Sequence, residues 1–280
     1  MKKFKILLLS GGGIKGIATV SVLERLKEEK ILDSIEKIIG SSIGSLIGLL
    51  LSLDYSPYAI RLLMTKIKYS DLQSYNIKNF INNFGFDDGS KFMKLVHVIL
   101  KYKNIDPYIT FEDFHKISKY HLSFMGTNVN LGVPVRFNVD THPKMKVVDA
   151  LRISTGFPLI FSPIKIGNHF FSDGGIMCPV ECNGLTKKEI KESLAIVIHK
   201  GFSEYKTDTL DRYIVALISN MLDALTETLI NKLRYKIIIS VPLFSMDLNI
   251  TDDQKEEMIN IGKKEAENFI NKIKLKKTKK

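Results

Sequence analysis

The start of the chain contains two glycine-rich turns, and each turn follows a short apolar run and precedes a helical pattern. A short apolar run bounded by a turn is typical of a strand buried on both faces of a sheet. The order strand, glycine turn, helix, repeated twice, therefore predicts a mainly parallel sheet with helices packed on it. The first unit comprises a strand at 5–9, a turn at 11–16 and a helix at 17–30, and the second comprises a strand at 34–39, a turn at 40–44 and a helix at 45–53.

The remainder of the chain continues the alternation of strands and helices, and we expect a three-layer α/β/α sandwich with a mainly parallel central sheet. Residues 56–118 are mostly helical in pattern, and they would either cover a site or form an ordinary helical layer. The last helix begins at Thr251, where Gln254 completes a possible capping box. The other expected elements are strands at 121–128, 133–139, 193–198 and 237–241, helices at 147–154 and 213–235, and a hairpin whose strands, 164–166 and 169–172, flank Gly167 and Asn168.

The charge of the chain favours anionic partners. Its 280 residues carry a formal net charge of +11, and six lysines without an acid lie in residues 272–280. This basic tail is either a solvated end or a segment attracted to anionic lipid headgroups. We expect no nucleic-acid partner, because no DNA- or RNA-binding motif is present and the chain has no Trp for stacking.

The sequence indicates neither a spanning helix nor a metal site. The most hydrophobic stretch, residues 38–53, is shorter than a membrane-spanning helix and is interrupted by Gly and Ser, so we expect no transmembrane segment. The N-terminal apolar run is too short for a signal peptide. Cys178 and Cys182 are a poor zinc or redox signal and are expected to be reduced thiols. We expect a cytoplasmic protein that contacts membranes peripherally, and export without a cleaved signal stays open as an alternative. We also expect the protein to use no cofactor or metal.

Gly40-Ser41-Ser42-Ile43-Gly44 has the pattern G-x-S-x-G between a predicted strand and a predicted helix. This context is typical of a nucleophile elbow, in which a serine sits on a sharp turn flanked by small residues. The N-terminus of the following helix favours negative charge that develops beside the serine. Ser42 is therefore the candidate nucleophile.

The earlier glycine turn, Gly11-Gly12-Gly13-Ile14-Lys15-Gly16, allows two functional interpretations. It matches the dinucleotide fingerprint G-x-G-x-x-G, but the acid expected at the end of the second strand is missing. Alternatively, its backbone N–H groups form an oxyanion hole, since glycine turns can direct consecutive donors at one point. Adjacent parallel strands would place this turn beside Ser42.

A serine nucleophile needs a base, and the residues leave two candidates. Asp173 lies in Ser172-Asp173-Gly174-Gly175, although an Asp-Gly pair taken alone is more typical of an ordinary hairpin or Asx turn. His199 follows a predicted strand and would complete a Ser42, Asp173, His199 triad. The other five histidines lie in no recognisable catalytic context.

The three motifs, in this order, resemble the signature blocks of the patatin-like phospholipase family. The segment 148–158, which precedes the Asp motif, also resembles the family. The resemblance covers about residues 5–185, which would form the catalytic domain, and residues 186–280 would be a C-terminal α/β extension that packs on the same domain. One departure is Ser10, where many members of the family carry Asp.

The resemblance implies a lipid acyl hydrolase of the phospholipase A type that works through an acyl-enzyme without a catalytic metal. Ser42 would be the nucleophile and Asp173 the base, with no histidine. Its substrate would be a phospholipid or another acyl lipid, with peripheral contact to an anionic membrane. The oxyanion loop would comprise Gly11, Gly12, Gly13, Lys15 and Gly16, the elbow would use Gly40 and Gly44, and the Asp motif would include Gly174 and Gly175.

Overall fold

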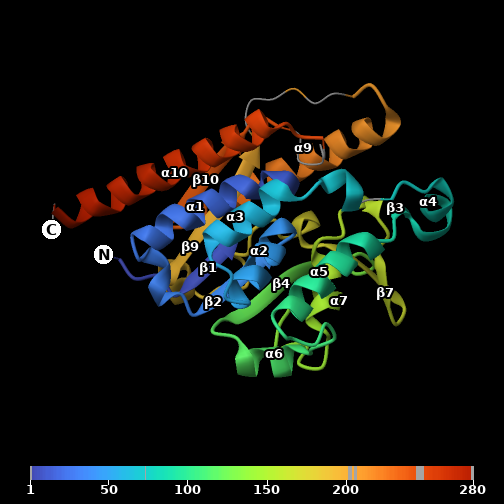
Figure 1. The fold of residues 1–280 in the computed structure, drawn as a ribbon, viewed down its shortest axis with the longest axis horizontal. Helices are drawn as coiled ribbons and strands as arrows, with labels where there is room; N and C mark the ends of the chain where they lie inside the picture. Colours follow the sequence, from blue (N-terminus) through green and yellow to red (C-terminus); the bar gives the residue numbers. More distant parts are fainter. Residues whose placement is uncertain (1, 73, 201–203, 205–206, 244–248, 279–280) are drawn as a thin grey trace.

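A computed structural model describes residues 2–72, 74–200, 204, 207–243 and 249–278. It confirms an α/β fold built on a central, mainly parallel sheet (Figure 1). The order of the strands is β10-β9-β1-β2-β4-β8-β7, and β5 pairs with β4 outside this path. The strands of this sheet are β1 (Ile6–Leu9), β2 (Lys37–Ser41), β4 (His121–Asn128), β5 (Val133–Phe137), β7 (Ile164–Ile166), β8 (His169–Asp173), β9 (Ser193–Lys200) and β10 (Lys236–Val241).

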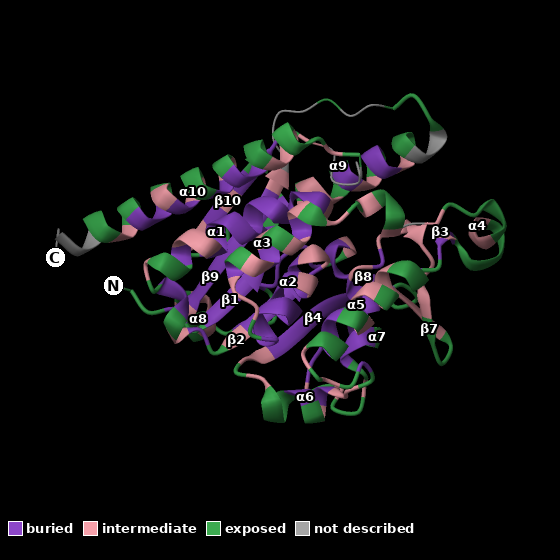
Figure 2. Cartoon of the chain, viewed as in Figure 1, coloured by how far each residue is buried: buried purple, intermediate pink, exposed green. Residues whose placement is uncertain are grey.

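Both faces of the central strands are buried, as Figure 2 shows by colour. Along β1, Leu7 and Leu9 belong to one apolar cluster, whereas Ile6 and Leu8 belong to a second cluster on the other face. This alternation follows from the two-residue repeat of a strand. The α-helices are α1 (Gly16–Glu28), α2 (Ile43–Ser52), α3 (Pro57–Lys66), α4 (Ile77–Asn83), α5 (Ser90–Tyr102), α6 (Phe111–Ile117), α7 (Val147–Ser154), α8 (Lys187–Glu192), α9 (Leu210–Ile230) and α10 (Asp252–Thr278).

The C-terminal residues extend the same sheet rather than forming a separate one. β9 pairs in parallel with both β1 and β10, so β9 and β10 widen the sheet beyond β1. Helix α10 packs along α1, where Met258, Ala266 and Ile270 are buried. The capping box predicted at Thr251 is present, since the N–H of Thr251 donates to Gln254 (2.8 Å) and the N–H of Gln254 donates to Thr251 (3.2 Å). The last two residues of the predicted basic tail, 279–280, lie outside the described residues.

Strands β2 and β8 pair with successive parts of strand β4. Some β4 residues that pair with β5 also pair with β2, and others also pair with β8. Because a strand has only two edges, β5 lies on one edge of β4, and both β2 and β8 lie on the other. Strands β2 and β8 therefore follow one another along a single edge of β4. Ser41 at the end of β2 pairs with Met125, and Asp173 at the end of β8 pairs with the next residue, Gly126. The pairing register thus places the Asp motif directly beyond the elbow.

Several predicted boundaries differ from the structure for local reasons. The second strand begins at Lys37 rather than at residue 34, because Ile31–Ser34 form a 3₁₀ helix in which the Ser34 hydroxyl donates to the carbonyl of Phe4 (2.9 Å). It also runs on to Ser41, inside the predicted turn. Helix α9 ends at Ile230, five residues before the predicted end, where Lys236 donates to the Ile230 carbonyl (2.6 Å). The parallel pair β3 (Gly85–Asp87) and β6 (Leu159–Phe161) was not predicted.

Helix α9 bears on the expectation of no membrane span, which rested on the N-terminal apolar run and on residues 38–53. By length and composition its segment 212–230 is apolar enough to cross a membrane, and 28% of that window is buried in the fold. The helix contacts β9, and its buried residues include Val215, Leu229 and Ile230. Its place in the structure is therefore against the sheet.

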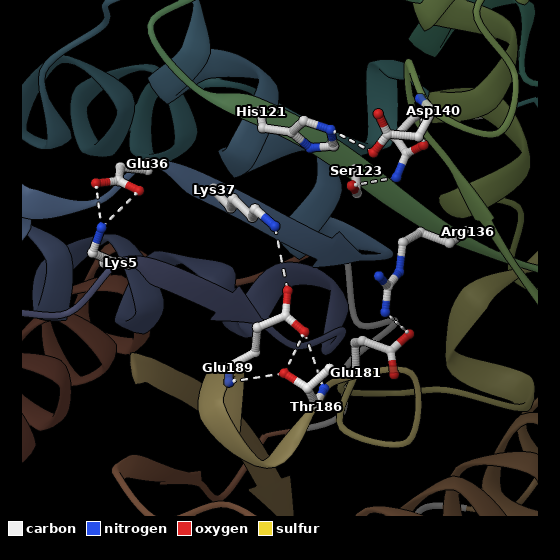
Figure 3. A network of polar contacts seen from close by, with 11 residues as sticks. Lys5, Glu36, Lys37, His121, Ser123, Arg136, Asp140, Glu181, Thr186 and Glu189 are labelled. Carbon is white, nitrogen blue, oxygen red and sulfur yellow. Dashed lines mark hydrogen bonds and ion pairs between the residues drawn. The ribbon is translucent and has the colours of Figure 1, made fainter. Parts of the chain in front are cut away.

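Ion pairs lie around the edge of the sheet where the parallel strands begin (Figure 3). Lys5 pairs with Glu36 (2.9 Å), and Lys37 at the start of β2 pairs with Glu189 (3.3 Å). Such exposed or half-exposed pairs each contribute about 0–1 kcal/mol to stability. The predicted functional motifs all lie at the opposite edge, where the parallel strands end and where sites of α/β proteins gather.

The elbow glycines allow a backbone contact between the two strand–helix units. A Cβ on Gly44 would lie 2.4 Å from the carbonyl oxygen of Leu9, and a Cβ on Gly40 would lie 2.5 Å from the backbone of Gly44. Neither contact can be relieved by rotating a side chain. Glycine at these positions therefore lets the start of α2 lie directly on the end of β1.

We predict that Gly44→Ala lowers the free energy of unfolding by about 3 kcal/mol or more, because β1 and α2 must separate to admit the methyl group. Gly48→Ala, one turn later in α2, is the matched control. Its added Cβ would meet only side chains, Ile38 at 3.0 Å and Leu122 at 3.4 Å, so it should stay within about 1 kcal/mol of the parent. Urea unfolding measures both, and equal losses would contradict the account.

Candidate active site

Ser42 occupies a sharp turn between β2 and α2, as the elbow motif predicts. Its backbone angles are φ 52° and ψ −126°, a conformation that side-chain-bearing residues seldom adopt. A Cβ on Gly11 would lie 3.1 Å from the Cβ of Ser42, so the first glycine turn lies directly beside the serine. The turn presents the Ser42 side chain to a cavity at the end of the sheet.

A buried serine on α7, which sequence reasoning did not single out, supports this turn. The N–H of Ser42 donates to the hydroxyl of Ser154 (3.2 Å), and the hydroxyls of Ser154 and Ser45 lie 2.7 Å apart. Ser154 and Ser45 are both fully buried. The only sequence signal was the position of Ser154 within the segment that resembles the family. Ser154 is therefore a positioning residue that ties the elbow to α7.

In the first glycine turn, some backbone N–H groups donate hydrogen bonds to residues that the structure describes and others do not. The N–H of Gly11 donates to Pro179, that of Lys15 to Gly12, and that of Gly16 to Gly13 and Ile14. Within the part of the chain that the structure describes, the N–H groups of Gly12 and Gly13 have no acceptor. Both glycines have positive φ, 148° and 56°, and both line the cavity beside Ser42. Two adjacent unengaged N–H groups form a site suited to an oxyanion.

The departure at Ser10 has a structural role in this turn. Its hydroxyl donates to the carbonyl of Gly11 (2.9 Å) and accepts from the N–H of Ile198 (2.8 Å). Ser10 thereby joins the end of β1 to the end of β9. Lys15 is also buried and lines the same cavity.

Asp173 ends β8 and is 2% exposed. Its backbone is held by Gly156, which accepts from its N–H (3.1 Å), and by Thr127, which donates to its carbonyl (2.9 Å). One carboxyl oxygen, Oδ1, accepts from the N–H of Gly175 (2.6 Å), which is the Asx turn that an Asp-Gly pair favours. Gly174 is needed at the next position, because a Cβ there would lie 2.3 Å from the carbonyl oxygen of Met125.

The other carboxyl oxygen of Asp173, Oδ2, takes no part in this Asx turn. It is buried and accepts no hydrogen bond from any described residue. Burial raises the pKa of Asp173 to about 7, and the Gly175 N–H and the nearby Ser42 hydroxyl partly oppose that rise. The Ser42 hydroxyl and the carboxyl thus lie close together without a formed hydrogen bond. Such contacts often tighten only when substrate binds.

An apolar cavity of about 210 Å³ opens beside Ser42 and Asp173. Residues from the helical stretch 56–118 form much of its wall, including Leu63, Phe92 and Val96, so this stretch covers the site. Helix α9 supplies a further part of the wall through Ser219, Leu222, Asp223 and Thr226. The cavity suits a hydrocarbon chain, since apolar atoms predominate among those that line it.

His199 lines the same cavity, so the fold brings both predicted bases to one site. The Ser42 hydroxyl lies near enough to the Asp173 carboxyl to lower its pKa, against the larger rise that burial causes. Among the residues that the structure describes, no three His, Cys, Asp or Glu side chains are grouped as metal ligands. Cys178 and Cys182 are free, buried thiols whose pKa values are raised by burial.

The sequence profile described as "Patatin-like phospholipase" matches residues 7–181, which are more than half of the chain. The chain belongs to the patatin-like phospholipase family. A probable lipid hydrolase of Invertebrate iridescent virus 6 is 33% identical over 218 residues, 73% of each protein. The protein YqhO of Bacillus subtilis is 23% identical over 94% of this chain and 97% of its own length. Membership in this family supports lipid hydrolase activity.

Solved structures show the same patatin-like fold at low sequence identity. VipD of Legionella pneumophila superposes with a TM-score of 0.62 over 96% of this chain and 67% of VipD, at 16% identity. ExoU of Pseudomonas aeruginosa, in its complex with SpcU, gives a TM-score of 0.51 over 97% of this chain and 52% of ExoU, at 19% identity. Both superpositions extend over nearly the whole of this chain and so beyond the residues matched by the family profile.

The raised pKa of Asp173 predicts a specific pH dependence of stability. The pKa of Asp173 is about 7 in the folded state and about 3.9 in the unfolded state, so the folded state binds this proton more tightly. The stability due to this proton is full below about pH 4 and is lost as pH rises through about 7. Asp173→Asn removes the titration and should therefore stabilise the protein more at about pH 8 than at about pH 5, by roughly 2 kcal/mol. Denaturant unfolding at both pH values measures this difference, and an equal effect at the two would contradict the assignment.

Proposed function

We propose that this protein hydrolyses acyl esters of lipids through a dyad of Ser42 and Asp173. The observation that carries the proposal is the buried Oδ2 of Asp173, which lacks a hydrogen-bond partner among the described residues and lies near the Ser42 hydroxyl. A carboxylate in that position can accept a proton from serine. Its pKa of about 7 makes it a much stronger base than an ordinary Asp near neutral pH.

The first half-reaction forms an acyl-enzyme. As Asp173 takes the hydroxyl proton, Ser42 Oγ attacks the ester carbonyl carbon, and the carbonyl electron pair moves onto oxygen. The N–H groups of Gly12 and Gly13 stabilise the resulting oxyanion. Collapse of this intermediate expels the alcohol or lysolipid, which takes the proton from Asp173.

The second half-reaction releases the fatty acid. Water gives a proton to Asp173 and attacks the acyl-serine, and the oxyanion again forms beside Gly12 and Gly13. Collapse returns the proton to Ser42 and restores the free enzyme. The apolar cavity would hold the acyl chain during both steps, and the class of substrate we favour is a phospholipid or another long-chain acyl lipid.

We predict that Ser42→Ala and Asp173→Ala each reduce turnover of a soluble short-chain ester at least about a thousandfold, because nucleophile and base act as a unit. In the unmodified protein kcat/KM should rise with pH and level off above about 7, since the ionised carboxylate is the base. A fluorophosphonate probe mapped by mass spectrometry should label Ser42.

His199→Gln provides the control for the competing triad. It should keep turnover within about threefold of the parent, because the dyad assigns no proton transfer to His199. Loss of turnover in this variant with an intact fold, or near-normal kcat in Asp173→Ala, would contradict the dyad.

Ser154→Ala should lower kcat about tenfold with little change in KM, since the elbow loses the hydroxyl that holds the Ser42 N–H while the cavity stays intact. Ser52→Ala is the matched control, because Ser52 is a buried serine whose hydroxyl donates within α2 to Gly48. Equal kinetic effects of the two substitutions would show that Ser154 has no specific positioning role.

A further inference from the structure

Residues 75–86, which we call the apical projection, expose apolar side chains that the sheet does not bury. Tyr75, Ile77, Ile81 and Phe84 are each more than half exposed. Ile77, Ile81 and Phe84 are spaced four and three residues apart, so they lie along one side of α4 and its end. Figure 1 shows α4 and the β7 strand at one end of the molecule, far from both chain termini.

The apical projection has an ordered core of its own. The ring of Phe86 stacks with Tyr75 (4.2 Å between centroids) and with Phe80 (4.3 Å). Phe84 makes an edge contact with Phe170 of the β7–β8 hairpin. The exposed apolar side chains are therefore held in place and do not result from a loose, unpacked segment.

A buried pair of charges fixes the base of the projection to the body of the protein. Asp87 accepts from the N–H groups of Ser74 (2.5 Å) and Gly89 (2.6 Å), and it interacts electrostatically with buried Arg152 of α7. Arg152 in turn donates to the carbonyl of Ser162 (2.9 Å), next to β6. Because α7 also carries Ser154, the projection has a fixed position relative to the elbow.

The projection adjoins the apolar cavity. Leu72, three residues before Tyr75, lines the cavity, and so does Phe161 of β6, the strand paired with β3. The cavity wall formed by α9 likewise has an exposed apolar side, with Tyr213, Leu217 and Met221 at four-residue spacing. Exposed apolar side chains thus occur on α9, which lines the cavity, and on the projection, whose near neighbour in the chain, Leu72, lines it.

The apical projection and residues 164–171 of the neighbouring β7–β8 hairpin carry positive charge and no acidic residue, which indicates the kind of partner they would bind. Lys78 is the only charged residue in 75–86, Lys165 is the only Lys, Arg, Asp or Glu in the hairpin 164–171, and neither segment contains an acid. An apolar, aromatic surface with flanking lysines is complementary to the interface of an anionic bilayer, where aromatic rings insert and lysines reach the headgroups.

We propose that the apical projection inserts into the surface of an anionic lipid bilayer and docks the cavity there for lipid entry. The proposal rests on the function proposed above, because docking at this end serves a site that takes an acyl chain. It assigns membrane contact to the projection rather than to the basic tail. The described end of α10 lies at the opposite end of the long axis (Figure 1), so a bilayer bound by the tail alone would lie far from the cavity.

The test uses the full chain with Ile77→Gln and Ile81→Gln combined, since these side chains are 64% and 69% exposed and their replacement costs little packing. The control combines Val98→Gln and Ile117→Gln, which are 63% and 60% exposed on α5 and α6. A third variant lacks residues 272–280. Each protein is sedimented with vesicles of equal parts phosphatidylcholine and phosphatidylglycerol at low and high salt, and its turnover of soluble 4-nitrophenyl butyrate is measured separately.

We expect the projection variant to bind vesicles about tenfold more weakly than the parent, with ester turnover unchanged. The control variant should match the parent in both measurements. Most of the projection-dependent binding should persist at high salt, which screens charge but does not weaken apolar insertion.

Three results would overturn the proposal. They are absence of vesicle binding by the parent, normal binding by the projection variant, and loss of binding only when residues 272–280 are removed. Light scattering that shows a dimer broken by Ile77→Gln and Ile81→Gln would instead make this face a contact between copies of the chain. Absence of ester turnover in the parent would contradict the proposed hydrolase while leaving the vesicle result to decide docking.

Discussion

The direct backbone contact between the start of α2 and the end of β1 determines the geometry of the whole site. At Gly44 and Gly40 there is no room for a side chain, so the two strand–helix units meet with their main chains touching. This contact sets Ser42 in a strained conformation and brings Gly11 against it. The helix that begins at Ile43 buries eight of its ten residues, and this packing can offset the cost of a strained residue, which is about 1–3 kcal/mol.

The register of β4 provides the second half of the arrangement. Because Met125 and Gly126 pair with Ser41 and Asp173, a shift of one residue would turn Asp173 away from Ser42. In the described part of the chain, Oδ2 of Asp173 is buried and accepts no hydrogen bond. Burial opposes ionisation of this carboxyl and raises its pKa to about 7, and the same burial would give the carboxylate the basicity that the proposed dyad requires. Burial of Asp173 is therefore the cause both of the stability that is lost when this carboxyl ionises and of its raised basicity.

The sequence was most informative where local chemistry alone fixes the structure. The helix at 147–154 and the strand at 121–128 have the predicted bounds, and the elbow and the glycine turn lie beside one another as parallel pairing requires. The parallel pair β3–β6 could not be predicted, because it joins two three-residue segments about seventy residues apart with no alternating pattern. Likewise, nothing in the sequence near Ser154 shows that its hydroxyl meets the Ser42 N–H, since that contact depends on how α7 packs.

The candidate catalytic residues lie in one region of the chain, whereas the cavity beside them is also lined by residues beyond that region. Ser42, Asp173 and the glycine turn lie within the residues that define the family, 7–181. Ile198, His199 and the cavity face of α9 lie beyond them, yet they line the same cavity. Oxyanion donors and a nucleophile act on any ester, whereas the length and shape of an acyl chain are read by the walls that surround it. Under the proposed function, substrate selection would depend in part on residues after 181, and substitutions at Leu222 should alter chain-length preference without altering the reaction proposed at Ser42.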